Sequence, residues 1–84
     1  MLNFTIAEAN HEFSFISMNR RRLQLFQVYV AVEGARHRFH MQIDENTNNF
    51  RIAERIHCPV QFHTLEERFS DAIKQYGVTE IVPT

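Results

Sequence analysis

The chain has 84 residues, of which 44% are hydrophobic and 12% aromatic, and its formal net charge is −1. This length allows one small domain with a single core, and the apolar content argues against an intrinsically disordered chain. The balanced charge excludes a strong overall attraction to nucleic acid or to membrane surfaces. No apolar run approaches the roughly 20 residues that span a membrane. Residues 1–13 lack the charged and apolar regions of a signal peptide.

Cysteine and arginine usage gives two further expectations. Cys58 is the only cysteine, so no internal disulfide can form, which fits a reducing compartment and predicts a cytoplasmic location. Arg supplies eight of the nine basic residues. Because the guanidinium is a planar fork suited to phosphate or carboxylate, this bias indicates anion recognition. A general preference for Arg over Lys in the genome explains it equally well.

Two strands are predicted before residue 19. Residues 2–7 alternate apolar and polar side chains, which is typical of a strand. After a connection at residues 8–11, residues 12–18 alternate around Phe13 and Phe15, with a bulge expected at Ile16. A helix over residues 5–13 is the alternative.

A long β-hairpin over residues 23–43 organises the chain. With Gly34 and Ala35 as a type II′ loop, Val32 faces His37 and the following pairs keep apolar residues on one side of the ribbon. A bulge near residues 25–26, or a second packing partner, would account for the apolar side chains at the start of the hairpin.

A further strand is predicted over residues 50–57, after a polar loop. Phe50, Ile52 and Ile56 fall on one side of it, and Glu54 interrupts this apolar face. Pro59 cannot donate to a sheet and ends the strand.

Residues 64–77 have the pattern of an amphipathic helix. Thr64 and Glu67 form a capping box, so Thr64→Ala is expected to cost about 1 kcal/mol. Gly77 fits the left-handed position after a helix, with Val78 placed for a Schellman closure onto Ile73. The apolar face comprises Leu65, Phe69, Ala72, Ile73 and Tyr76, and the polar face comprises Glu66, Glu67, Ser70, Asp71, Lys74 and Gln75.

These elements predict an α+β fold in one domain spanning residues 1–84: a four- or five-stranded antiparallel meander followed by one C-terminal helix packed on one face. The helix is expected to cover Val28, Val30, Phe39, Met41 and Ile52.

The other sheet face collects basic and aromatic side chains, which we treat as a candidate site for an anion or nucleic acid. In a meander Arg38 lies near Arg55, and Arg36 near His57, so an anion or Glu33 is needed to offset the repulsion. Arg with an aromatic ring can hold single-stranded nucleic acid by phosphate contact and stacking. A dimer interface or a plain solvated surface is the alternative. The candidate residues are Tyr29, Arg36, Arg38, His40, Arg51 and Arg55.

No cofactor, metal site or catalytic group is predicted. The spacing of His57, Cys58 and His63 fits no zinc pattern. Tyr29, Arg38 and His40 have the residue types of a ribonuclease-like trio, but such residues are common on strands without activity. Cys58 before a proline is better explained by packing.

Some residues resemble the repeat of the PUR nucleic-acid-binding family, which has four strands followed by a helix. The similarity covers residues 12–77 and rests on Phe13-Ser14-Phe15, Asn19-Arg20-Arg21, and Phe69 with Ala72-Ile73. Arg22 stands where the family has a glycine, and no site residue is carried over.

The function expected from the sequence is a small non-enzymatic interaction module that self-associates, as a homodimer or larger homo-oligomer, or binds another protein. The reason is a surplus of apolar residues that one helix does not cover, namely Phe13, Phe15, Leu23 and Leu25. The alternative is binding of nucleic acid or another polyanion through the Arg-rich face, and the third reading is a small ribonuclease-like enzyme.

Overall fold

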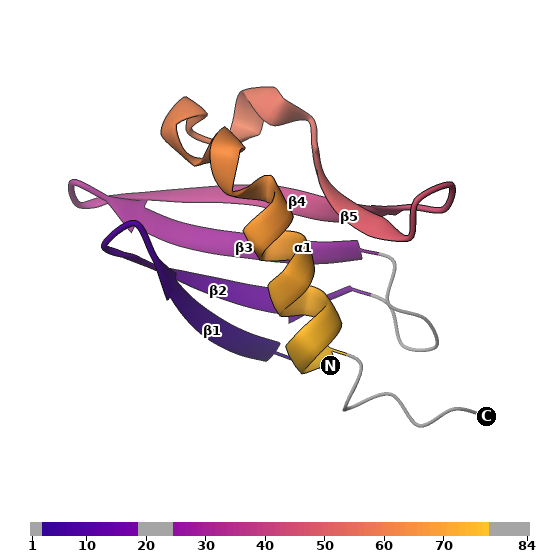
Figure 1. Cartoon of the computed structure of the whole chain (residues 1–84). Coiled ribbons are helices and arrows are strands. Elements are labelled where there is room, and N and C mark those ends of the chain that lie inside the picture. The colour runs from indigo at the N-terminus through magenta and orange to yellow at the C-terminus, as the bar shows by residue number, and fades with distance from the viewer. Residues whose placement is uncertain (1–2, 19–24, 78–84) are drawn as a thin grey trace.

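The computed structural model describes residues 3–18 and 25–77. Five strands form one antiparallel sheet in chain order, and a single helical segment follows (Figure 1). This confirms the predicted α+β meander. The strands are β1 (Asn3–Glu8), β2 (His11–Ser17), β3 (Leu25–Val32), β4 (Ala35–Asp44) and β5 (Asn49–Ala53). The helical part comprises the 3₁₀ turns η1 (Arg55–His57) and η2 (Val60–Leu65), the α-helix α1 (Glu66–Ala72) and the π-helical turn η3 (Ile73–Gly77).

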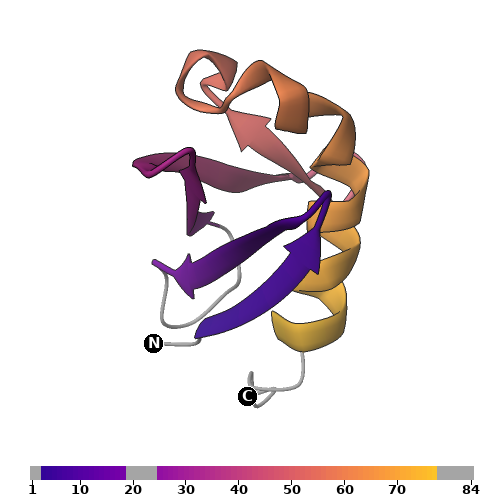
Figure 2. The same ribbon diagram turned by 90° about the vertical axis from the view of Figure 1, so that its left-hand side faces the viewer.

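The sheet curves around one side of α1, so that the helix lies along its concave face (Figure 2). Strand side chains alternate between faces, and the apolar set of each strand points to the helix. The helix covers the sheet face that the sequence predicted, which carries Val28, Val30, Phe39, Met41 and Ile52. The buried core comprises Phe13, Phe15, Phe26, Val28, Val30, Phe39, Met41, Phe50, Ile52, Cys58, Phe62, Phe69, Ala72 and Ile73.

Aromatic contacts around Phe69 join the helix to the sheet. The ring centroid of Phe69 lies 4.8 Å from that of Phe13, 5.7 Å from Phe15 and 5.8 Å from Phe39. These centroid distances suit tilted and edge-on ring packing. Phe13 and Phe15 therefore belong to the core that one helix covers, and the expectation that they would be left over is wrong.

The first two strands pair without interruption. Ala9 and Asn10, with φ of 48° and 62°, form a two-residue turn, and Glu8 pairs with His11. The alternative helix over residues 5–13 is therefore wrong. The bulge expected at Ile16 is also absent from this pairing, since Ile16 keeps its place in the register opposite Asn3 on one side and opposite Gln27 on the other.

The long hairpin forms, but its turn differs from the prediction. Glu33 and Gly34, with φ of 50° and 81°, are the loop residues, and Val32 pairs with Ala35. Positive φ at both positions is the type I′ geometry, which matches the right-handed twist of the strands. The register moves by two residues, so every side chain keeps its predicted face. Pairing from Leu25 onward is continuous, so no bulge forms near residues 25–26.

Strand β5 is shorter than predicted. It ends at Ala53, and Glu54 adopts the left-handed conformation with φ of 53°. Left-handed φ breaks the extended backbone, so the chain turns away from the sheet. Ile56 is consequently 89% exposed rather than placed on the apolar face. Glu54 interrupts the apolar pattern because the strand ends there.

The start of the helix also differs from the prediction. Thr64 lies inside η2, Leu65 is the residue before α1, and no side chain caps the helix. The capping box is wrong because the preceding 3₁₀ turns lead the backbone directly into the α-helix. Ser70, expected on the polar face, is only 2% exposed. The proposed closure by Val78 lies outside the described residues.

Side chains from the helical segment close the outer edge of β5. The Phe50 N–H donates to Ser70 Oγ at 2.9 Å, and the Ile52 N–H donates to Glu66 Oε2 at 2.9 Å. Lys74 Nζ also donates to the amide oxygen of Asn49. The first two bonds occupy outward backbone N–H groups with which a further strand would pair, and the third holds Lys74 over the start of β5.

Ser70→Ala is expected to lower the free energy of unfolding by about 1–3 kcal/mol, because the buried Phe50 N–H loses its acceptor. Urea unfolding followed by circular dichroism measures this. Thr64→Ala on the same segment is the control and should change the free energy of unfolding by less than about 0.5 kcal/mol, since Thr64 caps nothing. A larger loss for Thr64→Ala than for Ser70→Ala would contradict this account of the helix.

Candidate interaction surfaces

The convex face of the sheet, opposite α1, is polar and open; we call it the open sheet face. Cross-strand pairing aligns its side chains in rows, and one row runs through Thr5, Ser14, Tyr29 and Arg38. His40 lies in the next row, beside Gln27. Arg36 and Arg38 are exposed, and neither forms an ion pair within the described part of the chain. Four predicted site residues, Tyr29, Arg36, Arg38 and His40, therefore share this face.

Tyr29 is held by two contacts. Its hydroxyl donates to Gln27 Oε1 at 2.5 Å, and the Arg36 guanidinium lies 4.4 Å above its ring centroid. This is a cation–π arrangement, so the ring and the charge are presented together. A shallow hollow of about 320 Å³ lies beside them, lined also by Glu12 and Ser14.

The other two predicted arginines are engaged elsewhere. Arg51 lies at the far end of the open sheet face, with Nε 3.1 Å from Asp44 Oδ2. Arg55 belongs to η1, and its Nη2 lies 2.9 Å from Glu66 Oε2 on the helical segment. The expected approach of Arg55 to Arg38 is therefore wrong, because β5 ends before residue 55.

The other expected basic pair also fails to form on the sheet, since His57 lies in η1 as well. Its Nε2 is 3.1 Å from Glu54 Oε2, a neighbour within the same turn. Arg36 and His57 are therefore not neighbours on the sheet, and no anion or Glu33 carboxylate is needed to offset a repulsion between them.

Strand β1 is the other edge of the sheet, and within residues 3–18 and 25–77 no strand pairs with its outer side. Because a two-residue turn makes Glu8 and His11 a hydrogen-bonded pair, the backbone groups of Phe4, Ile6 and Glu8 point to β2. The N–H and C=O groups of Thr5 and Ala7 then point outward. The sequence showed the alternation of this strand but not its place at an edge, which depends on the order of all five strands.

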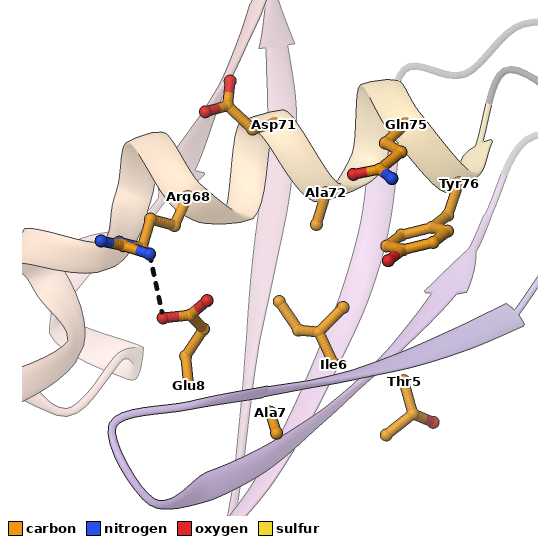
Figure 3. Close-up of a pocket in the computed structure, with 9 residues that line it drawn as sticks. All are labelled: Thr5, Ile6, Ala7, Glu8, Arg68, Asp71, Ala72, Gln75 and Tyr76. Carbon is orange, nitrogen blue, oxygen red and sulfur yellow. Dashed lines mark ion pairs between the residues drawn. The ribbon is translucent and has the colours of Figure 1, made fainter.

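A groove of about 430 Å³ separates β1 from α1 and η3; we call it the β1–α1 groove (Figure 3). Ile6 and Ala72 line its centre, and Tyr76 lies at the end near Thr5 (Figure 3). At the other end, Glu8 Oε1 is 3.5 Å from Arg68 Nη1.

Asp71 stands on the helix side of this groove and points away from its floor (Figure 3). It forms no ion pair among the residues that the structure describes. The charged groups lining the groove are Glu8 and Asp71 against Arg68, so the groove carries one uncompensated negative charge. Sequence reasoning missed this surface because its two walls, residues 5–8 and 68–76, are far apart in the chain.

Cys58 and His63 stabilise the corner between η1 and η2. His63 Nε2 donates to the carbonyl oxygen of Cys58 at 2.9 Å and lies 3.1 Å from that of Arg55. Burial raises the pKa of the Cys58 thiol from its usual value of 9.0 to about 11, although the nearby Arg55 charge opposes this. The thiol is thus a packing group, as predicted. Across residues 3–18 and 25–77, no three His, Cys, Asp or Glu side chains are grouped to hold a metal ion.

Comparison with protein-family models, with curated proteins and with solved structures finds no match to this chain. The resemblance to the PUR repeat therefore rests on the order of β2–β5 and α1 alone. Within the described residues no helix is long and apolar enough to cross a membrane. The function is consequently inferred from the chain's own geometry and chemistry.

Burial of Cys58 predicts a pH dependence of stability. Because the folded state disfavours the thiolate, the contribution of Cys58 is fully present below about pH 9 and is lost as pH rises towards about 11. Chemical unfolding across this range measures it, with Cys58→Ala as the control for other groups that titrate there. The wild-type protein should lose more stability than Cys58→Ala over this range, and equal losses would contradict the burial of the thiol.

Proposed function

We propose that this protein is a small, non-enzymatic interaction module of the cytoplasm that accepts an extended strand of another polypeptide at the β1 edge. One observation carries the proposal: side chains of the helical segment close the edge of β5, whereas in the described part of the chain no strand pairs with the outer edge of β1, which faces a groove. An unpaired edge is a template for a further strand, and proteins generally protect such edges unless they use them.

Strand addition explains both the edge and the groove. In this mode, main-chain hydrogen bonds supply affinity, and pockets for alternate side chains supply specificity. The β1 edge offers the backbone groups of Thr5 and Ala7, and the β1–α1 groove offers a place for side chains between them. The helix supports the groove from the concave face of the sheet.

The sequence predicts that the interaction module self-associates. The structure changes the reason for expecting this. Phe13 and Phe15 are fully buried in the core, Leu25 is half-buried, and Leu23 lies outside the described residues. Leftover apolar surface is thus no longer the main reason. The open edge of β1 replaces it, since a second copy can supply the added strand.

Thr5→Pro tests the β1 edge directly. Proline lacks the N–H that points outward, but the bonds between β1 and β2 are made by neighbouring residues, so the fold should persist. If the wild-type protein self-associates in sedimentation at high concentration, we expect Thr5→Pro to abolish that association.

Thr5→Ala, which keeps the N–H, is the control and should associate like the wild type. Circular dichroism checks the fold of both variants. A wild-type protein that stays monomeric at every concentration would set self-association aside and leave a different polypeptide as the strand donor.

The open sheet face supports a second candidate function, binding of single-stranded nucleic acid or another polyanion. The supporting observation is that Arg36 and Arg38 are exposed beside Tyr29 and His40, without ion-pair partners in the described residues. Arg supplies contacts to phosphate, and an aromatic ring supplies a stacking surface.

Fluorescence anisotropy of labelled single-stranded DNA and RNA, at low and moderate salt, tests this second function. The double variant Arg36→Gln/Arg38→Gln should bind more weakly and reduce the salt slope by about 1 for each lost phosphate contact. Arg55→Gln removes one such charge on the helical side and is the control, to be compared with each single variant, Arg36→Gln and Arg38→Gln. Undetectable binding by the wild type at low salt would refute this function.

A further inference from the structure

The β1–α1 groove has the chemistry to select one kind of strand. We propose that it binds an extended segment of a different polypeptide, with a branched apolar residue facing Ile6 and Ala72 and a Lys or Arg beside Asp71. This inference rests on the proposed strand addition at β1 and adds the identity of the strand.

The backbone of β1 determines which residues of the added strand face the helix. Thr5 and Ala7 point their N–H and C=O groups outward, so residues opposite them pair by hydrogen bonds. The side chains of those opposite residues project to the open sheet face, as the side chains of Thr5 and Ala7 do. The residue between them lies opposite Ile6 and projects into the groove.

The centre of the groove is apolar and has space. Ile6 is half-buried, and Ala72, at 8% exposed, presents only a methyl group to it. Tyr76 adds an aromatic surface at one end of the groove (Figure 3). A Val or Ile in the added strand fits this position, because branched side chains pack well on a pleated surface.

The charge of Asp71 determines which residue of the added strand fits beside the apolar one. Arg68 already pairs with Glu8, so its charge is occupied, whereas Asp71 has no ion-pair partner among the described residues. A cation on the incoming strand would complement Asp71. A second β1 strand, spanning Asn3–Glu8, has no Lys or Arg to offer to Asp71. Complementarity therefore favours a different polypeptide over a second copy.

The probe is a short fluorescein-labelled peptide of alternating Val and Thr with Lys at both ends, followed by anisotropy. Matched peptides replace both Lys by Glu, or the central Val by Pro. We expect the Lys peptide to bind the wild-type protein more tightly than either matched peptide does. Asp71→Lys should weaken binding of the Lys peptide by about two- to fivefold, the effect of one exposed ion pair, and strengthen binding of the Glu peptide.

Glu67→Lys is the matched control, because Glu67 is an exposed acid on the same helix that does not line the β1–α1 groove, although it shares with Asp71 the hollow on the β5 side. It should leave the preference between the two peptides unchanged. An equal effect of Asp71→Lys and Glu67→Lys would overturn the assignment of the cation to Asp71.

Failures of the two proposals are distinguishable. If Thr5→Pro abolishes peptide binding but Asp71→Lys leaves it unchanged, strand addition stands and the cation preference is wrong. If Thr5→Pro leaves peptide binding unchanged, strand addition itself is wrong. If the wild type binds no peptide and sediments as a dimer that Thr5→Pro dissociates, the occupant is a second copy and the peptide assignment is overturned. If it binds no peptide and stays monomeric, both proposals fail.

Discussion

Packing of Phe69 against the sheet is the interaction on which the rest of the structure depends. Its ring contacts Phe13 and Phe15 on β2 and Phe39 on β4, and all four side chains are fully buried. Truncating such a ring to alanine typically costs about 3–5 kcal/mol, a large part of the stability of a small domain. These contacts hold α1 over the concave face and thereby set what each of its other residues can reach.

The two edges of the sheet differ because successive helical residues point in different directions. Consecutive side chains are about 100° apart around a helix, so Ser70 turns to β5 and Ala72 turns to β1, while Asp71 lies between them and borders the hollows on both sides. On the β5 side, Ser70 and Glu66 accept from outward backbone N–H groups and complete the edge. On the β1 side, the small Ala72 leaves a groove. One short helix thus closes one edge and creates a candidate binding site at the other.

The groove and the open sheet face are separate surfaces with different chemistry. The groove carries an apolar centre and an uncompensated carboxylate, which suit a basic, extended polypeptide. The open sheet face presents Arg36 stacked on Tyr29, with Arg38 in the same row as the ring, which suits phosphate and bases. Because the two surfaces lie on opposite sides of β1, substitutions on one leave the other intact.

The sequence by itself determined the elements and their faces. Side chains alternate along a strand and recur every 3.6 residues along a helix, so the apolar pattern predicted the meander, the helix and the side of each that is buried. Even the misplaced turn at Glu33 and Gly34 preserved the faces, since a shift of two residues keeps the alternation.

The tertiary structure alone decided which edge is open, why Ser70 is buried and where Arg55 goes. All three features depend on contacts between segments that are distant in the sequence, such as the hydrogen bond from the Phe50 N–H to Ser70 Oγ. No local sequence pattern encodes such contacts.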